Sequence, residues 1–168
     1  MPQYSIDKVV MLAFTELPFN LPGNIFRSVM PYGSYDPDGE LLDRYISEQI
    51  TTVVVLAEER EMIQLSGRNL IALYQQQNWR VLHMPVIDFA TPDLQELKRT
   101  VTETLEYAGA GKHIAIHCSA GIGRTGLFAA CMAKQELGMT GEQAIAWVRQ
   151  YIPNAVETES QRKLVIDY

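Results

Sequence analysis

The chain has 168 residues, of which 47% are apolar and 20% are charged, and its formal net charge is −6. This length predicts one domain over residues 1–168, and the acidic balance argues against a nucleic-acid-binding surface. We expect no signal peptide and no membrane segment, because no stretch has the pattern of either. The two cysteines, Cys118 and Cys131, are too few for a disulfide framework and indicate a reducing, cytoplasmic location.

The first third of the chain predicts short strands separated by turns and helices. In chain order, the pattern predicts a strand over 8–14, a turn over 17–23, a strand over 25–30, a polar loop over 32–39, a helix over 41–50 and a strand over 51–56. The last of these strands is mostly β-branched, which is typical of burial within a parallel sheet. The charged segment 58–61 is expected on the solvated face of a helix over 58–65.

The rest of the chain alternates helices with two further strands. The pattern predicts a helix over 70–78, a strand over 80–85, a loop over 86–92, a helix over 94–108, a strand over 113–117, and helices over 125–137, 140–151 and around 164–168. Thr91 is expected to cap the helix over 94–108, with Pro92 and Asp93 in its first turn. Thr140 and Gln143 form a capping-box pattern. This alternation predicts an α/β fold, with a central, mainly parallel twisted sheet flanked by helices.

One stretch combines a reactive side chain with an anion-binding backbone. Cys118 is followed by five small or apolar residues, then Arg124 and Thr125. A strand-like run over 113–116 precedes it and a helix-like run over 126–133 follows, and such a turn directs backbone N–H groups toward an anion. A cysteine there sits where a thiolate is stabilised, and an arginine guanidinium fits two phosphate oxygens. The stretch therefore predicts a site where a thiolate attacks phosphorus.

The run over 117–125 resembles the signature loop of the cysteine-dependent protein tyrosine phosphatase superfamily. The late position of this loop and the small size of the chain resemble the dual-specificity branch. The segments 66–76 and 85–93 are similar to cyclin-dependent-kinase-associated phosphatases, so that the resemblance covers roughly residues 50–165. It implies a dual-specificity-phosphatase-like fold, a protein phosphatase activity that needs no cofactor, and a phosphoprotein substrate, for which a kinase is one candidate.

The resemblance implies a role for each residue of the loop, and phosphoryl transfer requires groups of these kinds. Cys118 is expected to attack phosphorus and form a phosphocysteine. Thr125 is expected to stabilise the thiolate when it leaves, and His117 to order the loop through hydrogen bonds. The phosphate oxygens are expected to be held by Arg124 and by the backbone N–H groups of the loop residues Ser119, Ala120, Gly121, Ile122 and Gly123.

Two aspartates compete for the role of general acid. Asp88 lies in a loop about thirty residues before Cys118, and the resemblance places the acid at this position. Asp93 is the rival, but we expect it in the first turn of a helix, where a carboxylate commonly stabilises the helix alone. We therefore favour Asp88.

Glu157 departs from the pattern of the related phosphatases. The segment 157–161 aligns with a Gln-Thr-x-x-Gln segment that positions the hydrolytic water in those enzymes, and Glu157 replaces the first glutamine. If the segment faces the loop, Glu157 either orients the water or serves as a second base. The alternative is the solvated start of a helix, and the sequence favours neither.

Three functions remain in competition. The first is a protein phosphatase for phosphotyrosine, with phosphoserine and phosphothreonine as further candidates. The second is a phosphatase of phosphoinositides, inositol phosphates or RNA 5′ ends, but enzymes of those classes often carry lysines in the loop and residues 119–123 have none. The third is a phosphate-binding module without turnover, against which the combination of Cys118, Arg124 and Asp88 argues.

The remaining residues of chemical interest are expected to be structural. Cys131 lies on an apolar helical run and is expected in the core, with a redox partnership with Cys118 as the weaker alternative. His83 and His113 lie in strand-like runs, which favours packing or hydrogen bonding. No cluster has the spacing of a metal site, so we expect no metal.

Overall fold

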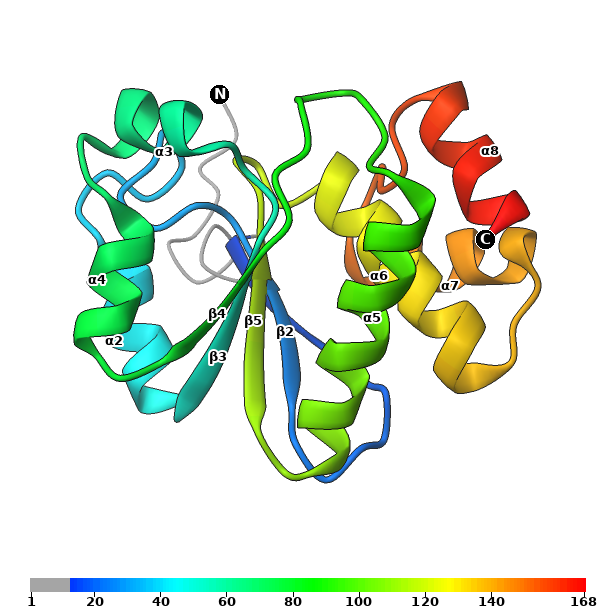
Figure 1. Cartoon of the computed structure of the whole chain (residues 1–168), viewed down its shortest axis with the longest axis horizontal. Coiled ribbons are helices and arrows are strands. Elements are labelled where there is room, and N and C mark those ends of the chain that lie inside the picture. Colours follow the sequence, from blue (N-terminus) through cyan, green and yellow to red (C-terminus); the bar gives the residue numbers. More distant parts are fainter. Residues whose placement is uncertain (1–12) are drawn as a thin grey trace, which may run out of the picture.

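The computed structural model describes residues 13–168, which fold around a five-stranded sheet with the strand order β1-β2-β5-β3-β4 (Figure 1). β1 pairs with β2 in the antiparallel direction, and every other neighbouring pair is parallel. The strands are β1 (Phe14–Leu17), β2 (Ile25–Ser28), β3 (Ile50–Val55), β4 (Arg80–His83) and β5 (His113–His117). The expectation of an α/β fold with a mainly parallel sheet is confirmed.

Helices cover both faces of the sheet (Figure 1). One face is covered by α2 (Glu40–Ser47), α3 (Glu59–Ser66) and α4 (Leu70–Gln76). The other is covered by α5 (Leu94–Gly109), α6 (Gly123–Leu137), α7 (Gly141–Tyr151) and α8 (Glu159–Asp167). No helix of residues 13–168 is both long enough and apolar enough to cross a membrane.

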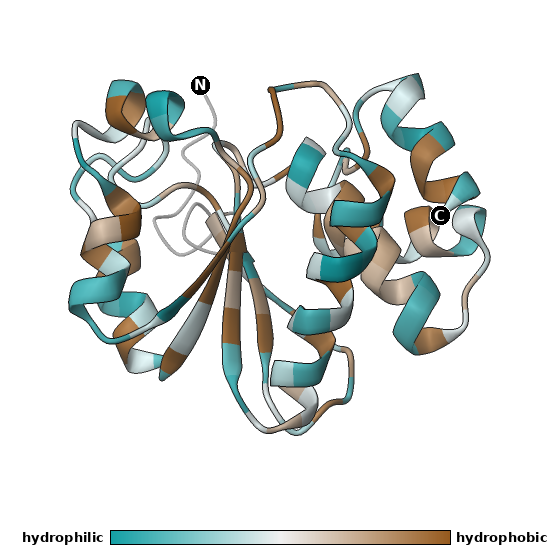
Figure 2. Ribbon diagram, in the orientation of Figure 1, coloured by the Kyte–Doolittle hydropathy of each residue, from teal (hydrophilic) through white to brown (hydrophobic). Residues whose placement is uncertain are grey.

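Successive side chains of a strand point to opposite faces of the sheet, so each face has its own apolar core. In β5, Ile114 and Ile116 pack into the core under α5–α8, and Ala115 packs into the core under α2–α4. The hydropathy colours show the same division, with apolar residues on the strands and polar residues on the outer sides of the helices (Figure 2). The central strand is therefore buried on both faces, as its continuous apolar run requires.

Several boundaries differ from those that the sequence predicted. The first strand begins at Phe14, and residues 8–12 of the predicted strand lie outside the described part of the chain. The prediction that Thr91 caps α5 is wrong: the N-cap is Asp93, whose Oδ1 accepts hydrogen bonds from the N–H groups of Gln95 and Glu96, both at 3.0 Å. The last helix begins at Glu159, five residues before the predicted run.

The parallel strands deliver their carboxyl ends to one edge of the sheet. The segments that follow β2, β3, β4 and β5 meet there, and backbone hydrogen bonds join them. Leu56 N donates to His117 O at 2.9 Å, Met30 N donates to Ser119 O at 2.8 Å, and Val86 N donates to Leu56 O at 3.0 Å. Open sheets of this kind bind ligands at this edge.

Candidate active site

Residues 118–124, here called the Cys118 loop, connect β5 to the first turn of α6. Cys118 is buried at 3% exposure. Gly121 has φ +69°, and a Cβ there would lie 2.3 Å from Ser28 O, so that only glycine fits this position. The loop thus turns against the end of β2, and its last residue, Arg124, lies in the N-terminal turn of a helix whose dipole favours an anion.

His117 is a neutral imidazole that is hydrogen-bonded to the first residue of the loop and to α4. Its ring lies between two partners: Nδ1 is 2.9 Å from Cys118 O and Nε2 is 2.8 Å from the hydroxyl of Tyr74. A carbonyl only accepts, so Nδ1 carries the proton and Tyr74 donates to Nε2. Burial lowers the pKa of His117 to about 4, although the hydrogen bond to Cys118 opposes this. His117 therefore orders the loop without a positive charge.

Arg124 is held in one orientation by a carboxylate and a carbonyl. Nη1 donates to Glu61 Oε2 at 2.8 Å and to Val86 O at 2.9 Å, and Nη2 donates to Glu61 Oε1 at 2.7 Å. Burial by itself would lower the pKa of Arg124, but Glu61 and the charges of Cys118 and Asp88 outweigh it and raise that pKa. Arg124 Nε is buried and has no hydrogen-bond partner among residues 13–168, so that one donor of the fork remains for a ligand.

Glu61 is a residue whose role the sequence reasoning missed. It was expected on a solvated helix face, but its carboxylate forms a bidentate pair with a guanidinium whose side chain is 1% exposed. The partners are 63 residues apart in the chain and meet because α3 follows β3, the neighbour of β5. Nothing in the local sequence distinguishes Glu61 from the exposed acidic residues before it.

Asp88 lies in the segment 86–92, here called the Asp88 loop, which follows β4. Its Oδ1 is 3.2 Å from Arg124 Nη2 and accepts a hydrogen bond from Phe89 N at 3.0 Å. The side chain is 52% exposed, so that it can reach both solvent and a bound ligand. Asp93, the rival candidate, uses its Oδ1 to cap α5. The structure therefore brings Asp88, and not Asp93, into contact with Arg124.

Glu157 faces the Cys118 loop from the segment before α8. A Cβ on Gly123 would lie 2.1 Å from Glu157 Oε2, so the carboxylate rests directly against the loop. Partial burial and the charge of Asp88 raise the pKa of Glu157, and Arg124 opposes this. Glu157 is exposed to solvent overall, but one of its carboxylate oxygens faces the Cys118 loop at Gly123.

Thr125 and Arg27 complete the surroundings of Cys118. Thr125 is fully buried, and its hydroxyl has no hydrogen-bond partner among the described residues. Arg27 on β2 is also buried. Burial lowers the pKa of Arg27 to about 10, and the charge of Cys118 opposes the shift.

The three other candidates from the sequence have structural contacts. His83 Nε2 bonds to Ala57 O at 2.9 Å, and His113 Nδ1 accepts from Asn24 N at 3.0 Å. Cys131 is a free thiol in the core, where burial raises its pKa to about 12. Within the described part of the chain, no group of three or more His, Cys, Asp or Glu residues is arranged to hold a metal ion.

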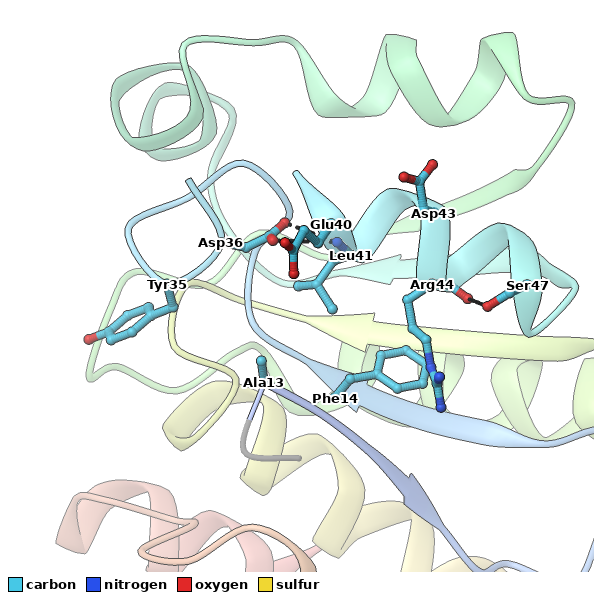
Figure 3. A pocket seen from close by; sticks show the side chains of 9 residues that line it. All are labelled: Ala13, Phe14, Tyr35, Asp36, Glu40, Leu41, Asp43, Arg44 and Ser47. Carbon is cyan, nitrogen blue, oxygen red and sulfur yellow. Dashed lines mark hydrogen bonds between the residues drawn. The ribbon is translucent and has the colours of Figure 1, made fainter. Parts of the chain in front are cut away.

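A cavity of about 420 Å³ lies away from the loop, between α2 and β1 (Figure 3). Phe14 and Leu41 line it with Asp36, whose carboxylate accepts hydrogen bonds from Tyr32 N at 3.1 Å and from Leu41 N. Burial raises the pKa of Asp36, while the backbone hydrogen bonds oppose this. Asp36 thus fixes the turn before α2, and no residue of the Cys118 loop lines the cavity.

Comparisons with known proteins find similar phosphatase domains. A family model described as "Swiss Army Knife protein, DSP-PTPase phosphatase domain" (PTP-SAK) matches residues 25–165. The dual specificity protein phosphatase CDC14C of Homo sapiens is 39% identical over 79 residues, which are 47% of this chain and 17% of that protein. The chain spans less than a fifth of the length of this and other similar curated relatives.

Two solved structures show the same fold. Tk-PTP in the active form is similar with a TM-score of 0.74 and 28% identity, covering 86% of this chain and 90% of that chain. Kinase associated phosphatase with its catalytic cysteine replaced by serine has a TM-score of 0.81 and 22% identity, covering 92% of both chains. The resemblance that the sequence indicated is confirmed.

Proposed function

The chain belongs to the PTP-SAK family of dual-specificity-type phosphatase domains, and on this premise we propose that it hydrolyses phosphotyrosine, and also phosphoserine and phosphothreonine, monoesters through a phosphocysteine intermediate. One observation carries the proposal. Arg124, which ends the loop that begins at Cys118, has a fixed guanidinium with Asp88 Oδ1 3.2 Å away from it. A nucleophile, a phosphate-binding group and a proton donor are thereby assembled at one edge of the sheet.

In the first step, the Cys118 thiolate attacks phosphorus, and a P–S bond forms while the ester P–O bond breaks. The N–H groups of residues 119–124 and Arg124 hold the three remaining oxygens, whose charge is spread over them in the transition state. Protonated Asp88 gives its proton to the leaving oxygen. The half-exposed position of Asp88 beside Arg124 supports this role. The products are an alcohol and phosphocysteine.

In the second step, water attacks the phosphocysteine. Asp88, now a carboxylate, removes a proton from the water as the new P–O bond forms and the P–S bond breaks. The thiolate of Cys118 leaves, and the otherwise unbonded hydroxyl of Thr125 stabilises it. Inorganic phosphate is released. Glu157 either orients this water or serves as a second base beside Asp88, which is supported by the contact of its carboxylate with Gly123.

The charges around the loop favour a substrate with one phosphate. Glu61 neutralises part of Arg124, and Asp88 and Glu157 add negative charge near it. Residues 119–123 carry no lysine. A phosphorylated protein, a kinase included, presents such a single phosphate, whereas phosphoinositides with several phosphates would meet like charges. We also propose a cytoplasmic location, since the mechanism requires a reduced Cys118.

The test is hydrolysis of p-nitrophenyl phosphate by the wild type and by Cys118→Ser and Arg124→Lys. We expect turnover by the wild type and its near abolition in both variants, because serine is a poor nucleophile and lysine lacks the planar fork. A wild type as inactive as Cys118→Ser would contradict the proposal and favour a phosphate-binding module. A panel of phosphopeptides and phosphoinositides then tests the substrate class, and faster hydrolysis of the lipids would contradict the protein assignment.

A further inference from the structure

Gln161, in the first turn of α8, has a fully buried amide that serves two segments of the chain. Its Oε1 accepts hydrogen bonds from Glu157 N at 2.9 Å and from Thr158 N at 3.4 Å. Its Nε2 donates to Ala90 O at 3.3 Å, 71 residues away in the chain. One side chain thus joins the N-terminus of α8 to the Asp88 loop.

The matching residue of α7 shows what a capping glutamine does by itself. Gln143 forms the same capping box with Thr140, whose N–H donates to Gln143 Oε1 at 3.0 Å. Gln143 is exposed, and no hydrogen bond of its side chain within residues 13–168 leaves the helix start. Gln161 therefore has two features that a capping box does not require, namely its burial and its hydrogen bond to Ala90.

The two segments that Gln161 joins carry the two carboxylates beside the Cys118 loop. Ala90 lies two residues after Asp88, and Glu157 itself donates to the amide. A second link runs parallel, since the hydroxyl of Thr158 donates to Phe89 O at 3.5 Å. The start of α8 therefore supports both carboxylates at once.

Both segments hold backbone conformations that need such support. Phe89 follows Asp88 with φ +62°, and Val156 precedes Glu157 with φ +61°. Side chains of these types rarely adopt the left-handed region, and they stay there only where the surroundings fix them. On the Val156 side, Arg149 donates to the carbonyls of Ala155 and Val156. On the Phe89 side, the contacts from Gln161 and Thr158 have this function.

We propose that Gln161 is a positioning residue, which holds the Asp88 loop over the Cys118 loop before substrate binds and so keeps Asp88 beside Arg124. The inference rests on the proposed function, because it assigns Asp88 the role of proton donor. Without the hydrogen bond to Ala90, fewer contacts hold the Asp88 loop in its strained backbone conformation. Proton transfer to the leaving group then slows, while attack by Cys118 keeps its machinery.

Two phosphate esters with different leaving groups distinguish proton transfer to the leaving group from attack by Cys118. Phenolate is a more basic leaving group than p-nitrophenolate, so phenyl phosphate depends more strongly on a positioned acid. In Gln161→Met, we expect the ratio of kcat/KM for phenyl phosphate to kcat/KM for p-nitrophenyl phosphate to fall about tenfold, since misplacement of a catalytic group by about 1 Å can cost about that much or more. Circular dichroism and the ratio itself, which is independent of the folded fraction, control for unfolding.

Gln143→Met is the matched control, because it removes the same capping bond from α7, where the Gln143 side chain makes no hydrogen bond to the Asp88 loop. We expect its ratio to equal that of the wild type. Gln161→Glu is the second variant: a carboxylate keeps the acceptor for Glu157 and Thr158 but cannot donate to Ala90 O, and its ratio should fall as in Gln161→Met. Combining Gln161→Met with Asp88→Asn should lower the ratio no further than Asp88→Asn does.

A ratio in both Gln161 variants that equals the wild-type value, or a change equal to that of Gln143→Met, would overturn the inference. Failure of the underlying function looks different, because the wild type would then hydrolyse neither ester. The two failures are therefore distinguished within one set of assays.

Discussion

The two faces of the sheet support the Cys118 loop through different kinds of contact. Under α2–α4, buried polar side chains bond across elements: Tyr74 on α4 bonds to His117 on β5, and Tyr45 on α2 bonds to Ser28 on β2. Both strand residues lie at the ends of their strands, where the loop begins or turns. The loop is thus oriented from this face by directional hydrogen bonds.

Under α5–α8 the core that holds α6 is apolar, and the buried Gln161 amide of this face bonds to the Asp88 loop and not to the Cys118 loop. The buried hydroxyls of Thr100 and Thr104 bond only to carbonyls of their own helix, at 2.9 and 2.7 Å, and so link nothing across this core. α6 is buried from Gly123 to Ala133 among apolar side chains. One face therefore determines how the loop is oriented, and the other determines how firmly the helix that follows it is held.

Phe128→Ala tests the packed face and has the largest expected effect. Phe128 is fully buried on α6, so its loss leaves a cavity and should lower the free energy of unfolding by about 3–5 kcal/mol. Urea denaturation measures this. Because no hydrogen bond is removed, the pH dependence of stability should match the wild type. A changed pH dependence would contradict the claim that the packing of α6 acts independently of the hydrogen bonds on the opposite face.

A pH titration of stability tests the hydrogen-bonded face. The unfolded chain protonates His117 near its ordinary pKa of 6.5, whereas the folded protein keeps it neutral down to about 4. The unfolded state therefore binds more protons in this window, so stability is full above pH 6.5 and falls as the pH drops toward 4. The contribution of His117 should reach on the order of 3 kcal/mol. His117→Gln should remove this part of the slope, and an unchanged slope would refute the assignment.

Glu61→Gln tests the support that α3 gives to Arg124. The amide keeps the size but loses the charge and one acceptor, which should cost about 1.5–3 kcal/mol of stability and lower kcat/KM about tenfold. Glu59→Gln on the exposed side of α3 is the control and should change neither. If Glu61→Gln and Glu59→Gln have the same stability and the same kcat/KM, the ion pair between Glu61 and Arg124 contributes to neither.

Tyr74→Phe is the mildest of these changes. It removes only the donor to His117 Nε2 and leaves the ring in place, so we expect a loss of about 1–3 kcal/mol from the unsatisfied nitrogen. The pKa of His117 should shift, and NMR titration of the imidazole measures it. A donor to Nε2 stabilises the neutral imidazole, so its loss should raise this pKa, and an unshifted pKa would contradict the assignment of Tyr74 as that donor.

The sequence predicted those parts of the molecule that depend on local pattern. The apolar run that became β5 and the spacing of Cys118, Arg124 and Thr125 are readable from neighbouring residues. The pairing of Arg124 with Glu61 and that of His117 with Tyr74 are not, because partners 63 and 43 residues apart meet only through the strand order.

Two local features also escaped the sequence reasoning. Asp93 caps α5 in place of Thr91, because one carboxylate oxygen accepts from two N–H groups at once. The start of α8 was hidden, because its first turn is polar and the residues that anchor it, Thr158 and Gln161, bond to a distant loop. Propensity gave the existence of these helices, and local capping bonds, from Asp93 in α5 and between Thr158 and Gln161 in α8, decided where each begins.

In the proposed mechanism, Cys118 carries the phosphoryl group during turnover. Rapid-quench mass spectrometry of the intact protein during hydrolysis of p-nitrophenyl phosphate tests it directly. We expect a transient phosphoryl adduct that peptide mapping assigns to Cys118 and that is absent from Cys118→Ser. Steady release of phosphate without any adduct on Cys118, or turnover by Cys118→Ser at the wild-type rate, would contradict it.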